Sequence, residues 1–293
     1  MADGPLAGKV AIVTGAGSTI GIGRVMTLAL VGAGARVTMT DINKETLEES
    51  ANVAREIGGD DSVLEVVADV SDPDDAEMTV SRTVSELGGL HILVNNAGTN
   101  PLNLGFSSAL RDSFWETSPE AWSKVVAVNF GGPFFMARAA VGHLMAQGWG
   151  RIIGVTTSVD TMIRKGLFPY GPSKAGHEAL VAIMAQELEG TGVTANVLVP
   201  GGQANTNLLP SDPELDRSAL IQPEVMQSPV VWLASDASDG INGLRFIAQR
   251  WDESLPIEQR IEKASAPVAW PQLGSQAVQP DLTTLPEGGI PGR

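Results

Sequence analysis

The chain has 293 residues, 43% of them hydrophobic and 18% charged, which fits one large α/β domain or two small ones and excludes a disordered chain. It contains no cysteine, which excludes disulfides and thiolate nucleophiles, and its formal net charge of −15 disfavours nucleic acid because an acidic surface repels phosphate backbones. The three histidines are widely spaced, so we expect no metal centre. We also expect no signal peptide and no membrane-spanning segment, which makes a cytoplasmic location the default.

Apolar runs rich in β-branched residues alternate with helical patterns along the chain. The predicted strands cover residues 9–14, 35–41, 62–69, 90–95, 151–157, 194–199 and 243–248. The predicted helices cover residues 24–31, 44–57, 73–87, 119–147, 172–189 and 223–234. Strict alternation of strand and helix predicts a doubly wound, largely parallel sheet covered on both faces, in three α/β/α layers.

The last 43 residues, 251–293, differ from the rest because they contain six prolines and show little periodicity. This composition predicts a tail that packs over residues 1–250 or over a neighbouring subunit, with disorder in about its last dozen residues. Residues 1–250 are expected to form a single domain.

A cluster of glycines, TGAGSTIGIG over residues 14–23, joins the first predicted strand to the first predicted helix. Glycines at this position let the backbone turn tightly and approach a pyrophosphate, which then faces the unpaired N–H groups of the helix N-terminus. The pattern therefore predicts a dinucleotide phosphate site, and a flexible loop without a ligand is the alternative.

Asp41 ends the second predicted strand, 26 residues beyond Gly15. A carboxylate there can accept hydrogen bonds from both ribose hydroxyls of NAD and would repel the 2′-phosphate of NADP. We therefore expect NAD, although Arg24 and Arg36 could meet a phosphate and keep NADP open. The alternative is that Asp41 caps the helix over residues 44–57.

The segment YGPSK over residues 170–174 carries the only tyrosine of the chain. Tyr170 and Lys174 are four residues apart and share one face of a helix. A nearby ammonium lowers the pKa of a phenol, which is what a general acid or base near neutral pH requires. The alternative is a surface pair without a catalytic role.

Taken together, these motifs resemble the short-chain dehydrogenase/reductase family over about residues 6–248. The resemblance implies a Rossmann-type sheet of about seven strands in the order 3-2-1-4-5-6-7. It also implies a homo-oligomer, a tetramer or dimer, that pairs through the helices at 119–147 and 172–189. The cofactor contacts that it implies are Gly15, Gly17, Ser18, Thr19, Gly21, Ile22, Gly23, Asp41, Ile42, Asp69, Val70, Asn96, Ala97, Gly98, Tyr170, Lys174, Pro200, Gly201 and Thr206.

The same resemblance implies an oxidoreductase that moves a hydride between NAD(H) and a secondary alcohol or ketone. Tyr170 would protonate the carbonyl oxygen or deprotonate the alcohol, and Lys174 would lower the phenol pKa and hold the nicotinamide ribose. Asn129 would keep a water in the proton path. The alternative is a non-catalytic member of the fold that senses dinucleotide or binds a partner, which the presence of both Tyr170 and Lys174 disfavours.

The chain departs from the family pattern in two places. Five residues separate Gly15 from Gly21, where the family has three, so the phosphate contacts are expected to change. The family also has a serine about thirteen residues before the tyrosine. Here Thr157 stands at that spacing and Ser158 follows it, so both remain candidates for the hydroxyl that bonds the substrate oxygen.

Three longer segments, 99–117, 159–169 and 205–221, are expected to wall the substrate site. Large apolar side chains in the first two would make the wall apolar: Phe106, Phe114, Trp115, Met162 and Phe168.

Overall fold

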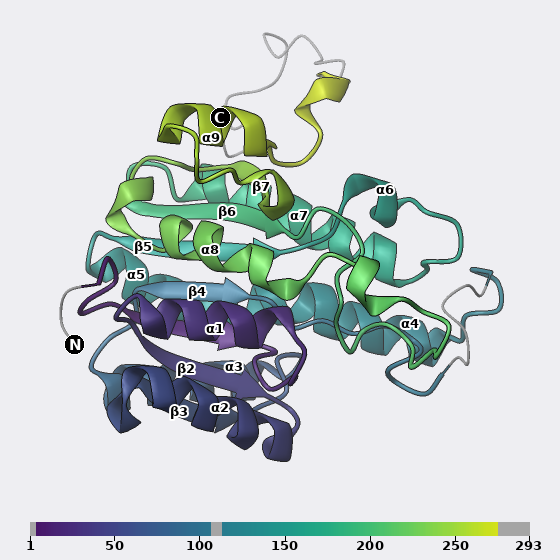
Figure 1. Ribbon diagram of the computed structural model, residues 1–293, viewed down its shortest axis with the longest axis horizontal. Helices are drawn as coiled ribbons and strands as arrows, with labels where there is room; N and C mark the ends of the chain where they lie inside the picture. The colour runs from purple at the N-terminus through teal and green to yellow at the C-terminus, as the bar shows by residue number, and fades with distance from the viewer. Residues whose placement is uncertain (1–3, 107–112, 275–293) are drawn as a thin grey trace, which may run out of the picture.

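The computed structural model describes residues 4–106 and 113–274, which form one twisted sheet between two layers of helices (Figure 1). The sheet has the order β3-β2-β1-β4-β5-β6-β7-β8, in which β1 to β7 pair in parallel and β8 pairs antiparallel with β7. The strands are β1 (Val10–Thr14), β2 (Arg36–Asp41), β3 (Val63–Val67), β4 (Ile92–Asn95), β5 (Gly150–Val155), β6 (Val193–Val199), β7 (Leu244–Ile247) and β8 (Ser265–Pro267). The predicted fold class and strand order are confirmed, with one strand more than predicted.

The helices divide between the two faces of the sheet. α1, α2 and α8 lie on one face, while α3, α5 and α7 lie on the other (Figure 1). The helices are α1 (Ile22–Gly32), α2 (Lys44–Gly58), α3 (Pro73–Leu87), α4 (Pro119–Val126), α5 (Gly132–Ala146), α6 (Val159–Met162), α7 (Tyr170–Glu187), α8 (Gln227–Leu233) and α9 (Ile257–Ala264).

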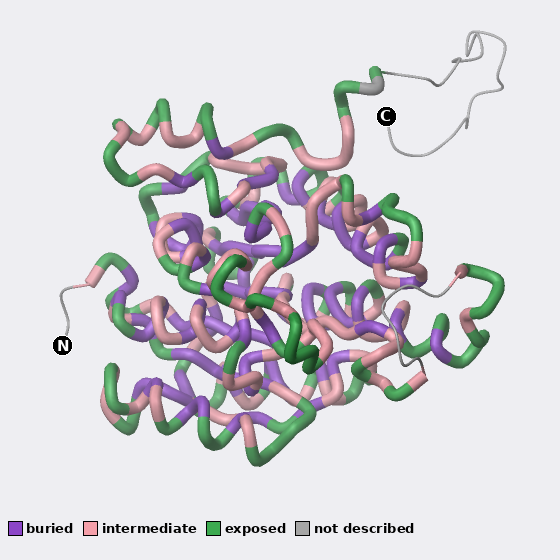
Figure 2. The backbone as a smooth tube through the Cα atoms, turned by 45° about the vertical axis from the view of Figure 1, so that its right-hand side comes forward, coloured by how far each residue is buried: buried purple, intermediate pink, exposed green. Residues whose placement is uncertain are grey.

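The strands form the centre of the molecule because their side chains are apolar on both faces. Every residue of β1, β5 and β6 is buried, and Figure 2 shows this buried interior surrounded by the exposed outer sides of the helices. One core cluster joins the sheet to α1, α2 and α8, and a second joins it to α3, α5 and α7. Two covered faces explain why the strands are continuous apolar runs and not alternating patterns.

The strand order reverses between β1 and β4, since β1 has β2 on one side and β4 on the other. In an open parallel sheet, loops diverge at this point and leave a crevice outside the carboxyl ends of the strands. The loops that follow β1, β4, β5 and β6 meet there, so the topology determines where a site can form.

The predicted helix over 119–147 is interrupted by a π-helical turn, η2 (Ala127–Gly131), between α4 and α5. By length and composition alone, the 28-residue stretch Pro119–Ala146 could cross a membrane, because its most apolar window has a mean hydropathy of 1.3. Its contacts with α3, α7, β4 and β5 make it part of the layer that covers the sheet. Such a stretch is weak evidence for a span, and the absence of a membrane segment remains a prediction.

The described part of the C-terminal segment, residues 251–274, contains α9 and the eighth strand. Trp251 is buried against Trp232 and Phe246, and β8 extends the sheet beyond β7. The sequence predicted a packed tail here, but neither α9 nor β8 was predicted. The predicted disordered end lies in residues 275–293, outside the described residues.

Candidate active site

A cleft of about 1040 Å³ lies at the carboxyl ends of the strands. Its walls come from the loops after β1, β4, β5 and β6 and from the start of α7. Fifteen of the residues predicted from the sequence line it: Gly15, Ser18, Gly21, Ile22, Asp41, Asn96, Ala97, Gly98, Thr157, Ser158, Tyr170, Lys174, Pro200, Gly201 and Thr206.

The other seven predicted residues are not among the described residues that line the cleft. They are Gly17, Thr19, Gly23, Ile42, Asp69, Val70 and Asn129. Ile42 is exposed on the surface, and the carboxylate of Asp69 accepts hydrogen bonds from the backbone N–H and hydroxyl of Ser71. Val70 is buried against Gly132. Asp69 and Val70, the two cofactor contacts predicted after β3, therefore contact other residues of the chain.

The glycine loop brings the start of α1 close to the end of β4. Gly15 has a φ of +65°, and a Cβ there would lie 2.8 Å from the Cα of Ala97. A Cβ on Gly23 would lie 2.3 Å from the carbonyl oxygen of Gly15, so only glycine permits this packing. The Asn96 side chain closes the arrangement by donating to the carbonyls of Thr14 and Gly15.

The N-terminus of α1 faces this loop without a side-chain cap. Its N-cap residue Gly21 makes no capping hydrogen bond, and its first turn holds no acidic residue. The N-caps of α2 and α3, Asn43 and Asp72, both accept a hydrogen bond from the backbone. The orphan N–H groups of α1 are therefore suited to an anionic ligand.

Asp41 holds the lengthened glycine loop. One carboxylate oxygen accepts from the backbone N–H of Gly17 at 2.9 Å and the other from that of Asn43 at 3.1 Å. The Ser50 hydroxyl donates to the carbonyl of Gly17 and holds the loop from the other side. Asn43, not Asp41, caps α2, which rules out the alternative role for this carboxylate. Asp41 still lines the cleft, and a carboxylate has lone pairs for further donors.

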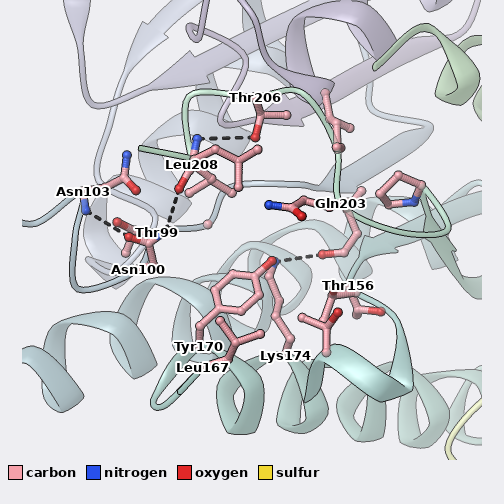
Figure 3. Close-up of a pocket in the computed structure, with 18 of the residues that line it drawn as sticks. Thr99, Asn100, Asn103, Thr156, Leu167, Tyr170, Lys174, Gln203, Thr206 and Leu208 are labelled. Carbon is pink, nitrogen blue, oxygen red and sulfur yellow. Dashed lines mark hydrogen bonds between the residues drawn. The ribbon is translucent and has the colours of Figure 1, made fainter. Parts of the chain in front are cut away.

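Tyr170 and Lys174 lie on the first turns of α7 and point together into the cleft (Figure 3). The Lys174 ammonium is buried and donates a hydrogen bond of 2.9 Å to the carbonyl oxygen of Val155, at the end of β5. Gly98 lies opposite, where a Cβ would come within 3.1 Å of the Lys174 Nζ. The helical spacing of the pair thus directs both side chains into the same part of the cleft.

The pKa of Tyr170 differs from the sequence-based expectation. Burial raises the phenol pKa to about 12, and a hydrogen bond with Thr157 lowers it by less. Burial also lowers the pKa of Lys174 to about 8. Desolvation therefore outweighs the expected effect of the ammonium on the phenol, because both groups leave water together.

Thr157 and Ser158 make different contacts beyond the end of β5. The Thr157 side chain lowers the pKa of the nearby phenol, whereas the Ser158 hydroxyl caps α6 by accepting from the backbone N–H of Thr161 and also bonds the Thr161 hydroxyl. Both residues line the cleft. The geometry gives Ser158 a structural task and leaves Thr157 beside the phenol.

Asn129 lies in the π-helical turn, behind the cleft wall. Its side chain accepts from the backbone N–H of Thr99 at 2.7 Å and donates to the Thr99 carbonyl and to the Ser173 hydroxyl. The turn moves the residue out of regular helical register, as π-bulges often do at functional sites. In this arrangement Asn129 fixes the loop after β4 against α7.

Comparison with known proteins places these features in one family. Residues 9–214 match the family model for short chain dehydrogenases. The chain belongs to the short-chain dehydrogenase/reductase family. It is 32% identical over 251 residues to 2-dehydro-3-deoxy-D-gluconate 5-dehydrogenase of Escherichia coli (strain K12), covering 81% of this chain and 92% of that protein. It is 34% identical over 268 residues to the chloroplastic NADPH-dependent aldehyde reductase 2 of Arabidopsis thaliana, covering 83% and 93%.

Solved structures of this family have the same fold. A dehydrogenase/reductase from Sinorhizobium meliloti 1021 has a TM-score of 0.70 and 30% identity over 81% of this chain and 92% of its own. Levodione reductase has a TM-score of 0.71 and 27% identity over 80% and 93%. The chain is therefore an oxidoreductase of the short-chain dehydrogenase/reductase type, which uses NAD or NADP.

The residues present fit such a dinucleotide. Gly15, Gly21 and Ile22 at the uncapped N-terminus of α1, and the carboxylate of Asp41, line one part of the cleft, and Gly23 packs behind Gly15. Tyr170 and Lys174 occupy the other end. A bound nicotinamide cofactor would supply or accept the hydride at that end.

The walls of this dehydrogenase cleft come from parts of all three predicted segments and are largely apolar, as predicted, but Leu102, Leu167, Leu208 and Leu209 supply most of the apolar side chains. Of the five large side chains, only Phe168 lines the cleft. Phe114 and Trp115 are exposed, Met162 is buried in the core, and Phe106 faces the Lys124 ammonium. Residues 107–112 of the first segment lie outside the described residues.

Amide side chains also line the cleft, and nothing in the sequence pattern indicated them. Asn100 and Asn103 donate to the carbonyls of Leu208 and Asn207, and the Asn207 side chain donates to the Ser18 hydroxyl. These bonds hold the loop after β6 against the loops after β4 and β1, and Figure 3 shows the bond between Asn100 and Leu208. Helical or strand periodicity carries no signal for such loop-to-loop contacts.

Proposed function

We propose that this chain transfers a hydride between NAD(H) and a secondary alcohol or ketone, with Tyr170 as the proton-transferring residue. The observation that carries the proposal is the meeting of Tyr170, Lys174 and Thr157 at one end of a cleft whose other end is formed by the glycine loop and Asp41. This arrangement allows a proton donor to act at the place where a hydride would arrive.

In the reductive direction, the Tyr170 phenol donates its proton to the substrate oxygen as negative charge develops there. At neutral pH the phenol is protonated, because its pKa of about 12 is high. The Thr157 hydroxyl donates a hydrogen bond that favours the resulting phenolate, and the Lys174 ammonium adds a positive charge nearby. In the oxidative direction, the same phenolate takes the proton of the alcohol.

The experiment that tests the proposal follows NADH absorbance with a panel of ketones and secondary alcohols, with cofactor binding measured separately. Turnover of at least one ketone or alcohol, together with NADH binding, is the expected result. Tight dinucleotide binding without turnover of any compound would favour a dinucleotide sensor instead.

The cofactor preference is expected to depend on Asp41. Asp41→Ala removes the carboxylate that would accept from the ribose hydroxyls, so NAD affinity should fall about tenfold while NADP affinity changes less or rises. Titration of the protein with each dinucleotide checks this. Asp72→Ala, at an exposed cap of α3 outside the cleft, is the control and should leave the ratio of the two affinities unchanged. An equal loss for both dinucleotides in Asp41→Ala would count against the ribose contact.

Thr157 and Ser158 are expected to respond differently to removal of the hydroxyl. Thr157→Val should lower turnover at saturating cofactor by about a hundredfold, as loss of one donor at a developing oxyanion does. Ser158→Ala should lower stability by about 1 kcal/mol through loss of the α6 cap, with turnover near that of the wild type. Steady-state rates and urea unfolding of both variants measure this. The reverse pattern of turnover would assign the catalytic hydroxyl to Ser158.

We also propose that the chain forms a homo-oligomer through α4, α5 and α7. Trp122, Phe134 and Ile183 lie on these helices with 40%, 44% and 52% of their surface exposed, and Phe130 lies between them in the π-helical turn with 40% exposed. Large apolar side chains in such numbers on one layer are typical of a surface that a partner covers. We propose that this assembly is a tetramer or a dimer. We also propose that it is cytoplasmic.

A further inference from the structure

A buried ion pair lies directly behind the candidate catalytic hydroxyl. Arg245 belongs to β7 and Glu178 to α7, one turn after Lys174, and their side chains are 8% and 1% exposed. Burying two charges costs free energy, which their mutual attraction repays only when further hydrogen bonds satisfy them. The further hydrogen-bond partners of this pair therefore indicate which segment of the chain it positions.

Within residues 4–106 and 113–274, the further side-chain hydrogen bonds of this pair go to Thr156 and Thr157. The Arg245 guanidinium donates through one nitrogen to the carbonyl oxygen of Thr157 and through the other to Glu178 and to the Thr156 hydroxyl. The Thr156 hydroxyl donates to the same oxygen of Glu178 at 3.0 Å. The planar guanidinium of Arg245 thus links β7 and α7 to the segment that carries the Thr157 hydroxyl.

This segment has few other anchors. The pairing of β5 with β6 ends at Val155, so the backbone of Thr156 and Thr157 lies beyond the ladder. Lys174 holds the carbonyl of Val155, and Arg245 holds the carbonyl of Thr157 two residues later. Two cations from different elements, α7 and β7, therefore hold carbonyls at the two ends of this short segment.

We propose that Arg245 and Glu178 are positioning residues, which fix the Thr157 peptide so that its hydroxyl faces the Tyr170 phenol. The proposal rests on the proposed function, because it acts through Thr157. The guanidinium is suited to this task because its rigid fork reaches the Glu178 carboxylate and the Thr157 carbonyl at once, which a lysine ammonium does not do with fixed geometry.

A second buried arginine provides a matched control. Arg151 lies at the opposite end of β5, is almost fully buried, and pairs with Asp239. Its other hydrogen-bond partners are the carbonyls of Gly150 and Ser235 and the Ser238 hydroxyl, none of which lines the cleft. Loss of Arg151 should therefore lower stability without changing the turnover of the folded protein.

The test is a double-mutant cycle between the ion pair and Thr157. Arg245→Met with Glu178→Leu replaces both charges by apolar side chains of similar volume, so the protein is expected to fold. Turnover at saturating substrate should fall by about ten- to a hundredfold, while the dissociation constant of NADH stays within about twofold. In the Thr157→Val background the same replacement should cause almost no further loss, because the hydroxyl that it positions is already absent.

Several outcomes would overturn the proposal: unchanged turnover, an equal loss with and without the Thr157 hydroxyl, or a parallel loss of NADH binding. A loss of the same size in Arg151→Met would do so as well. If the double replacement does not fold, Arg245→Lys keeps the charge pair, and full turnover in that variant would also overturn it. Turnover of Tyr170→Phe, measured alongside, separates the two failures: if it is undiminished, the proposed function itself is wrong.

Discussion

Tyr170→Phe is expected to bind NADH with near wild-type affinity and to lose about a thousandfold in turnover, within the range that a general acid contributes. The ring remains and continues to fill its place at the start of α7, while the only proton donor of the phenol type in the chain is removed. Steady-state reduction of the best ketone at saturating NADH, with NADH binding measured by titration, gives both quantities.

The phenol itself can be followed in the wild type because no other tyrosine contributes to a titration by tyrosinate absorbance. With its pKa raised to about 12, Tyr170 should remain protonated in the free protein at pH 10, where an ordinary tyrosine is about half ionised. Undiminished turnover of Tyr170→Phe would exclude the assigned role. Weakened NADH binding equal to the loss of turnover would mean that the residue binds and does not transfer a proton.

Lys174→Met is expected to lose about a hundredfold in turnover and yet to unfold with a higher free energy than the wild type at pH 7. The turnover falls because the positive charge beside the phenolate is lost. The stability rises because burial lowers the pKa of Lys174 from 10.5 to about 8, which is a cost that the folded protein bears whenever the amine is charged. Deducting the lost hydrogen bond to Val155, we expect a gain of about 2 kcal/mol.

The pH dependence of this gain has a definite sign. Between pH 8 and 10.5 the unfolded chain holds a proton on Lys174 that the folded protein has lost, so wild-type stability rises with pH in that range relative to the variant. The gain of Lys174→Met is therefore full below pH 8 and disappears as the pH approaches 10.5. Urea unfolding of both proteins at pH 7 and pH 10 measures it. A variant less stable than the wild type at pH 7 would show that the ammonium stabilises the fold.

The sheet and the main site residues could be predicted because they follow from local patterns. Buried parallel strands are continuous apolar runs, and a glycine cluster after the first of them or a Tyr–Lys pair on one helical face is visible in the letters alone. These features lead to a parallel sheet and to a cleft with Gly15, Asp41, Tyr170 and Lys174 on its walls, whereas the strand order was implied only by the resemblance to the family.

The features that could not be predicted depend on contacts between distant segments. The pKa of Tyr170 depends on burial, which the spacing to Lys174 does not report. The amide-lined wall depends on loops such as those carrying Asn103 and Asn207, more than a hundred residues apart. One signal was present and unused: Arg245 stands in the apolar strand LRFI, where a charge on a doubly covered sheet needs a buried partner, here Glu178.

The most direct test of the central claim is a crystal structure of the chain with NADH bound. The account predicts the pyrophosphate at the N-terminus of α1 and the nicotinamide ring beside Tyr170, with the phenol oxygen within about 3.5 Å of the place where a carbonyl oxygen would sit. A nicotinamide ring bound outside the cleft, or a phenol turned away from it, would contradict the account.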